Sequence, residues 1–152
     1  MLRRVLIAAA GVVAIIVSAA QVSQAAEFGT AEEAKAMLEK VVVAVNSDKA
    51  KALEAFNAGA DGFKDRDLYP FCANAADGVI TAHPVLKGKQ LRDIKDKNGF
   101  ALGEEMMKVA DTEGKIGEVA YMWPRPGSDT PSQKVSYVTN ISDQICGVGY
   151  YQ

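Results

Sequence analysis

The chain has 152 residues, 49% of them hydrophobic, and its 17 Lys and Arg against 19 Asp and Glu give a net charge of −2. This mildly acidic balance argues against nucleic acid or an anionic membrane surface as a partner. After the first segment no apolar run approaches the roughly 20 residues of a membrane span, and the remaining length suits one domain.

The N-terminal segment has the three parts of a secretory signal. Arg3 and Arg4 precede the apolar run from Val5 to Val17, and Ser23-Gln24-Ala25 fits a small-x-small cleavage site. This pattern predicts a signal peptide over residues 1–25 and a periplasmic or secreted domain over 26–152. Without Arg3 and Arg4, 15 basic residues stand against 19 acidic ones, a net charge of −4. The alternative is an uncleaved N-terminal anchor, because the apolar run is close to the lower length limit for a span.

A long helical region follows. Thr30 with Glu33 three residues later forms a capping-box pattern. Apolar residues then recur at helical spacing, which predicts one stripe that packs on a core. The stripe consists of Ala34, Met37, Leu38, Val41 and Val45. Asn46, Ser47 and Asp48 interrupt it and are expected to cap a second helix, which Gly59 ends.

The rest of the chain predicts five strands. The first runs over Leu68–Asn74, and the strong turn signal Asp77-Gly78 leads into the second, Val79–Pro84. A loop over 85–98 and a short helix over 100–110 precede a hairpin within 118–138, and the last strand runs over 144–151. This order of elements predicts an α+β fold with one antiparallel sheet: two helices come first, then two strands, a crossover and three more strands. The long helix would cover one face, and the loop with the short helix would form a lid on the other.

The hairpin carries most of the chemistry. Side chains alternate along a strand, so Tyr121, Trp123 and Arg125 share one face of its first arm, and Lys134 with Ser136 share one face of the second. Tyr137 has the opposite parity to Lys134 and is expected in the core. Aromatic walls with one or two fixed cations suit a small anion such as a carboxylate.

Two cysteines, Cys72 and Cys146, fall in the first and last predicted strands. In an oxidising compartment such a pair favours a disulfide, and the alternative is two buried free thiols.

We find no pattern for catalysis or a bound cofactor. His83 is the only histidine, and the chain has no phosphate-binding glycine loop and no Cys-x-x-Cys. The neighbouring Glu104 and Glu105 would point apart on a helix. Asp93, Asp96 and Asn98 lack the full calcium-loop pattern and are interpreted as a solvated turn. The sequence therefore predicts a protein that is not an enzyme.

Motifs spread over the chain resemble the single Cache domain, type 2. They are Gly78–Pro84, Leu86-x-Gly88-Lys89, Asp93-x-x-Asp96-x-x-Gly99, Tyr121-x-Trp123-Pro124-x-Pro126-Gly127, Lys134-x-x-Tyr137 and Gly147-x-Gly149-x-Tyr151. The resemblance implies a PAS-like five-stranded antiparallel sheet with a long N-terminal helix on one face and a lid on the other. It also implies an extracytoplasmic domain that binds small molecules, often short organic acids, and feeds a chemoreceptor or sensor kinase.

The chain departs from that family in lacking a second span and an output domain, so the resemblance implies a free-standing domain that signals through another protein. Asn74 also stands where many members have Asp, and Cys146 where an aromatic or aliphatic residue is usual. In the family the first and last strands are neighbours, which would bring Cys72 and Cys146 together as a disulfide.

We therefore expect a ligand site for a small organic acid. In it Lys134 and Arg125, facing each other across the hairpin, neutralise the ligand, His83 and Tyr121 orient it, and Trp123 closes an apolar wall. Tyr69, which shares a strand face with Phe71, is a further candidate. Alternatives remain for each residue: His83 can bind a backbone carbonyl, the two cations can be a solvent-exposed pair, and the aromatics can be core. A His83 ligand would make affinity depend on pH near neutrality. The competing function is an accessory protein with a vestigial pocket that docks to a membrane receptor or kinase.

Overall fold

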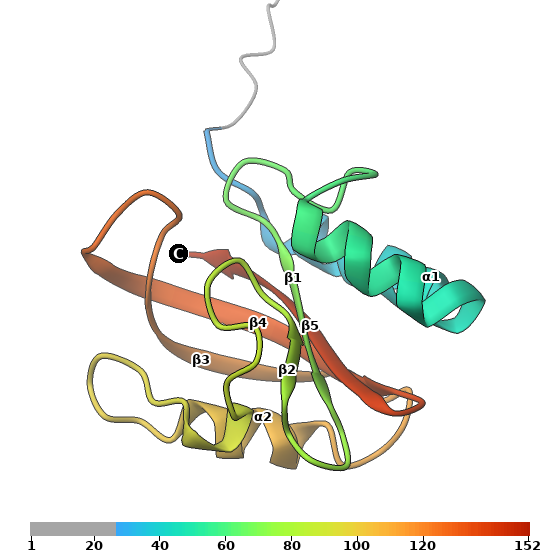
Figure 1. Cartoon of the computed structure of the whole chain (residues 1–152). Coiled ribbons are helices and arrows are strands. Elements are labelled where there is room, and N and C mark those ends of the chain that lie inside the picture. The colour runs from blue at the N-terminus through green and yellow to red at the C-terminus, as the bar shows by residue number, and fades with distance from the viewer. Residues whose placement is uncertain (1–26) are drawn as a thin grey trace, which may run out of the picture.

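The computed structural model describes residues 27–152 and consists of one sheet between a long helix and a lid (Figure 1). Its elements are α1 (Ala31–Ala58), β1 (Pro70–Asn74), β2 (Ile80–Ala82), the 3-10 turn η1 (Leu91–Asp93), α2 (Leu102–Val109), β3 (Gly117–Pro124), β4 (Pro131–Ile141) and β5 (Gln144–Tyr151). The predicted signal peptide lies outside the described residues. The strands form a five-stranded antiparallel sheet in the order β2-β1-β5-β4-β3, so the predicted fold class is confirmed.

Local capping signals define both ends of α1. The Thr30 hydroxyl accepts a hydrogen bond from the Glu33 N–H, and the Glu33 carboxylate accepts one from the Thr30 N–H, so the predicted capping box is present. Gly59 ends the helix in the left-handed conformation at φ 64°, where a side chain would be strained. The predicted interruption at Asn46–Asp48 is present. Asp48 has non-helical backbone angles (φ −156°, ψ 94°) at a kink between two helical segments of α1, and its side chain caps the second segment by accepting from the Lys51 N–H at 3.1 Å.

Helix α1 covers one face of the sheet with the predicted stripe. Ala34, Leu38 and Val41 are fully buried against Cys72, Cys146 and other residues of that face. Cys72 and Cys146 are directly opposite each other on β1 and β5 and form a disulfide, as predicted. Tyr137 also faces α1, stacked on Tyr150 at 6.0 Å between ring centroids, which confirms that it points away from Lys134.

The lid lies on the opposite face of the sheet. In Figure 1 residues 85–110, which include η1 and α2, pass across β3 and β4 on the side away from α1. Leu91, Leu102 and Met106 of the lid are buried against Phe71, Val119 and Val138 of the sheet. This second core leaves a small space at one end, which is the candidate site.

The predicted solvated turn in the lid is partly wrong. The Asp96 carboxylate is buried and accepts hydrogen bonds from the N–H groups of Asn98 at 2.8 Å, Phe100 at 2.9 Å and Met122 at 3.0 Å. Burial raises the pKa of Asp96, but these backbone donors outweigh it and hold the pKa below the usual value. Because Met122 belongs to β3, Asp96 fastens the lid to the strand that carries Tyr121 and Trp123.

Candidate functional site

A small cavity lies between the sheet and the lid. Its volume is about 30 Å³, more than the roughly 10–15 Å³ that a single water molecule needs. Most of its wall is apolar, and the polar or aromatic groups Tyr69, His83, Tyr121 and Trp123 gather at one end. The complete lining is Tyr69, Phe71, Cys72, Ala73, Ile80, His83, Leu86, Leu91, Ile94, Leu102, Met106, Tyr121 and Trp123. An apolar cavity with a few converging polar groups is the usual form of a small-molecule site.

Lys134 lies buried behind this polar end. In the hairpin it stands directly opposite Tyr121, and across β5 it stands opposite Tyr151. Its side chain is 1% exposed, and its Nζ donates to the Tyr69 hydroxyl at 3.0 Å and the Tyr151 hydroxyl at 3.4 Å. The same Nζ lies 4.1 Å and 4.6 Å from the centroids of those two rings. Lys134 does not line the cavity, and Tyr69 connects it to the wall.

Gly149 makes room for this lysine. A Cβ at position 149 would lie 2.4 Å from Lys134 Cε and 2.3 Å from Ser136 Oγ, closer than real contacts allow. Gly149 pairs with Ser136 on the neighbouring strand, so the bare backbone of β5 forms the channel floor along which the lysine extends. The Gly-x-Gly of the last strand thus has a packing function at the site.

The charge of Lys134 is poorly compensated. Within residues 27–152, no carboxylate lies within ion-pair distance of its Nζ. Burial lowers the pKa of Lys134 to about 7, and the charge of Asp67 opposes this only in part. The ammonium and amine forms are therefore both populated near neutral pH. An anion placed beside Lys134 would favour the ammonium form and would be bound by it.

His83 presents a proton donor at the cavity. Its Nδ1 accepts hydrogen bonds from the N–H groups of Val85 at 3.0 Å and Leu86 at 3.2 Å, so the ring proton of the neutral form is on Nε2. Burial, and secondarily the charge of Lys134, lower its pKa to about 4. His83 is therefore neutral at pH 7. In the unliganded domain Lys134, rather than His83, is the group whose pKa lies near neutrality.

Aromatic side chains complete the polar end. The Tyr121 hydroxyl is hydrogen-bonded to Ser136 Oγ at 2.8 Å, and burial raises the pKa of Tyr121 and of Tyr69, so both phenols stay neutral. Ring edges meet ring faces from Tyr69 to His83 at 5.6 Å, from His83 to Trp123 at 6.3 Å, and from Trp123 to Tyr121 at 6.1 Å. Five of the six predicted site residues thus come together: Tyr69, His83, Tyr121, Trp123 and Lys134.

Arg125 is the exception. It does not face Lys134, because the residue opposite Lys134 is Tyr121 and β3 already ends at Pro124. Its Nη1 donates to Asp67 Oδ2 at 2.8 Å, so its charge is neutralised within the protein. It lines an adjoining outer hollow of about 450 Å³, which shares Tyr69, His83 and Trp123 with the cavity between sheet and lid. The predicted role of Arg125 as a direct ligand of the acid therefore has no support in this geometry.

Comparison with known proteins identifies the fold. A family model for the Cache domain matches residues 28–151. The chain belongs to the Cache domain family. Cache domains are extracytoplasmic sensor domains that bind ligands, which agrees with a cavity between sheet and lid.

Three solved sensor domains resemble this Cache domain closely in fold. That of a methyl-accepting chemotaxis protein from Vibrio parahaemolyticus is 25% identical with a TM-score of 0.63, over 79% of this chain and 86% of that one. A periplasmic sensor domain of a chemotaxis protein is 28% identical at 0.60, over 79% and 88%. A Cache chemosensory domain described for its recognition of carboxylic acids is 26% identical at 0.59, over 79% and 86%.

One curated relative is the methyl-accepting chemotaxis protein McpP of Pseudomonas putida. It is 38% identical over 72 residues, which are 46% of this chain and 13% of that protein. The chain thus matches a small part of that chemoreceptor. Together the comparisons show a Cache sensor domain homologous to the periplasmic domains of chemoreceptors.

Two residues that hold the polar end of the cavity together, Tyr151 and Asp67, are not among the predicted site residues. Tyr151 accepts from Lys134 and donates its own proton to the Pro124 carbonyl at 2.7 Å, and Asp67 holds Arg125. The Gly-x-Gly-x-Tyr pattern includes Tyr151. That Tyr151 lies directly opposite Lys134 depends on the register of β4 and β5, which a single sequence does not specify. Asp67 lies in the polar connector before β1, where nothing marks a buried carboxylate.

The described residues also limit the chemistry of this Cache domain. Between residues 27 and 152, no group of three or more His, Cys, Asp or Glu residues is arranged to hold a metal ion. None of the helices described there is long and apolar enough to cross a membrane.

Proposed function

We propose that this Cache domain binds a short carboxylic acid in the cavity between sheet and lid and reports its occupancy to a signalling partner. The observation that carries the proposal is Lys134, a buried cation beside the cavity with no carboxylate in contact in the described part of the chain. A buried ammonium without a counter-charge is unfavourable, and a carboxylate ligand would supply the missing charge.

The donors suit one carboxylate group. His83 offers its Nε2–H, and the hydroxyls of Tyr69 and Tyr121 lie at the same end of the cavity. The ammonium of Lys134 contributes its charge through Tyr69, or directly after a rotation of its side chain. The rest of the wall is apolar and suits a short alkyl tail, which points toward Leu102 and Met106 of the lid.

The cavity volume favours the smallest acids. A space of about 30 Å³ suits acetate or propionate better than a larger acid. The similarity to a Cache domain described for carboxylic acid recognition supports the same ligand class. The similarity to chemotaxis proteins supports a chemoreceptor or sensor kinase as the partner, and a periplasmic location.

A thermal-shift and calorimetric screen tests the proposal with acetate, propionate, pyruvate, lactate and amino acids. An acid at 100 times its dissociation constant should add about 2.7 kcal/mol to the free energy of unfolding. Lys134→Met should lose the effect. Lys49→Met, which removes an exposed lysine on the α1 side, should keep it. Absence of a shift with every acid would reject the proposal and favour an accessory protein with a vestigial pocket.

A further inference from the structure

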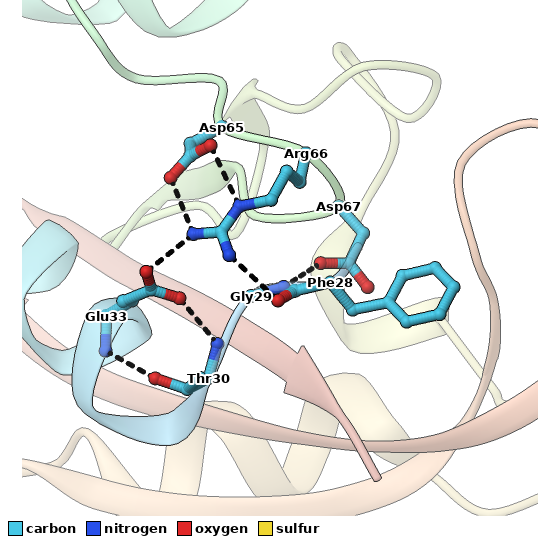
Figure 2. A network of polar contacts seen from close by, with 7 residues as sticks. All are labelled: Phe28, Gly29, Thr30, Glu33, Asp65, Arg66 and Asp67. Carbon is cyan, nitrogen blue, oxygen red and sulfur yellow. Dashed lines mark hydrogen bonds and ion pairs between the residues drawn. The ribbon is translucent and has the colours of Figure 1, made fainter. Parts of the chain in front are cut away.

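Asp67 is a buried carboxylate that joins two parts of the chain. Its Oδ2 accepts from Arg125 Nη1 at 2.8 Å, just beyond the end of β3. Its Oδ1 accepts from the Gly29 N–H at 2.8 Å, in the segment that enters α1 (Figure 2). Asp67 is 5% exposed, so both bonds are shielded from water and from salt.

The bond between Asp67 and Arg125 connects Asp67 to the cavity. The Arg125 guanidinium lies 4.7 Å from the centroid of the Tyr151 ring, and the Tyr151 hydroxyl donates to the Pro124 carbonyl at 2.7 Å. The same hydroxyl accepts from Lys134 Nζ at 3.4 Å. A continuous series of contacts therefore connects Asp67 through Arg125 and Tyr151 to the buried ammonium of Lys134.

Arg125 and the loop around Asp67 also contact the segment that enters α1. The Arg125 guanidinium also lies 3.9 Å from the centroid of the Phe28 ring, so Phe28 and Tyr151 both pack on the same cation. Arg66 donates to the Phe28 carbonyl at 2.8 Å and pairs with Glu33 at 2.7 Å, as Figure 2 shows. The chain segment 28–33 is thus fastened to the loop 65–67 at several points.

We propose that Asp67 is a positioning residue of the Lys134 site, and that through it the anion affinity of the pocket and the placement of residues 28–30 depend on each other. The affinity part rests on the proposed function, whereas the link between Asp67, Phe28 and Lys134 requires no ligand. Coupling of this kind is reciprocal: a perturbation of the entering segment must change the site as much as the site changes the segment.

The charges around Lys134 show how the link acts. Lys134 donates to the hydroxyls of Tyr69 and Tyr151 and stands opposite Tyr121 in the hairpin, and burial keeps these phenols neutral. Neutral His83 lies nearby. The charge of Asp67 opposes the lowering of the Lys134 pKa by burial, and the positive charge of Arg125, paired with Asp67 Oδ2, offsets part of the Asp67 charge. A shift of Arg125 relative to Asp67 therefore changes the field at the ammonium as well as the position of Tyr151.

Two variants test the link, and each leaves the cavity lining intact. Phe28→Ala removes a 41% exposed ring that touches Arg125, and Asp67→Asn retains an oxygen for the Gly29 N–H but loses the charge. Asp143→Asn, which breaks the exposed ion pair with Lys49, is the control. Three measurements are compared: the titration of Lys134 by NMR of its ε-carbon, propionate binding by calorimetry, and amide hydrogen exchange of residues 28–33.

Phe28→Ala should weaken propionate binding at least about fivefold, the lower end of typical coupling. Asp67→Asn should lower the Lys134 titration midpoint by about 0.7 pH unit, which corresponds to a fivefold change in the proton affinity of Lys134. In the wild type, propionate should slow exchange in residues 28–33 by a similar factor, and Asp143→Asn should behave like the wild type in all three measurements.

The proposal is overturned if exchange in residues 28–33 speeds up in both variants while the Lys134 midpoint and propionate affinity stay within about twofold of wild type. Asp67 would then only support the fold. If the wild type binds no acid, the proposed function fails, but the Lys134 titration still decides the link: a shift in the variants supports it and an unchanged midpoint rejects it. If Asp67→Asn does not fold, Phe28→Ala carries the test.

Discussion

Replacing Lys134 by Met should make the unliganded domain more stable and abolish its binding of acids. Met has a similar length and no charge, so it can occupy the channel over Gly149 without the unfavourable burial of an ammonium. The same substitution removes the buried cation that would attract a carboxylate into the cavity. Stability and binding are thus expected to change in opposite directions.

The size of the effect follows from the pKa of Lys134. It is about 7 in the folded domain against 10.5 for the ordinary side chain, a difference of about 3.5 units. At about 1.4 kcal/mol per unit, charging Lys134 destabilises the fold by roughly 5 kcal/mol. Because the unfolded chain binds the extra proton between these two values, wild-type stability should rise with pH from about 7 toward 10.5. Below pH 7 the full penalty is present.

The comparison with Lys134→Met isolates this effect, because other titrations occur in both proteins. Urea unfolding followed by circular dichroism at pH 6, 7, 8, 9 and 10 should show Lys134→Met more stable at pH 6. The gap should narrow by about 1.4 kcal/mol per pH unit above pH 7, the slope of one proton. Lys49→Met, at a lysine whose side chain is 46% exposed, should not show this slope. Parallel curves for wild type and Lys134→Met would refute the assignment of a charged, buried lysine.

Three further predictions follow from the geometry. Acetate affinity, measured by calorimetry, should be constant from about pH 5.5 to 6.5, because His83 with its pKa of about 4 stays neutral, and should fall about tenfold per pH unit above pH 7 as Lys134 loses its proton; loss of this pH dependence in His83→Gln would instead indicate the histidine. Replacing Cys72 and Cys146 by Ala should lower the free energy of unfolding by about 4 kcal/mol, since the bridge closes a loop with a sequence separation of 74; a change below about 1 kcal/mol in chemical denaturation would contradict this estimate. Gly149→Ala should displace the lysine and cost about 1–3 kcal/mol by overpacking, and acid binding at wild-type affinity in this variant would contradict the channel.

Much of the fold could be predicted because its signals are local. The Thr30–Glu33 capping box, the left-handed stop at Gly59 and the apolar stripe between them each depend on residues a few positions apart. The alternation in the hairpin likewise separates Lys134 from Tyr137. The Cys72–Cys146 pairing was predicted from a resemblance that implied adjacent first and last strands, and the register confirms it.

The site was predicted less completely because its contacts cross the sheet. Arg125 was assigned opposite Lys134, whereas the actual register puts Tyr121 there and leaves Arg125 beyond the strand end, paired with Asp67. Asp96 was interpreted as solvated, although the lid turns it onto the Met122 N–H. In each case the partner is more than 20 residues away along the chain or depends on a register that a single sequence does not specify.

The sequence by itself determined which residues could share a face, because strand and helix periodicity follow from backbone geometry alone. It also placed the only Trp, the only His and Lys134 among candidates for one site. Only the tertiary structure decided which cation remains without a carboxylate partner, because that depends on where Asp67 lies relative to two strand ends. Because Asp67 neutralises Arg125, that residue supports the fold. Lys134 is buried without a carboxylate partner, so its ammonium form favours binding of an anion.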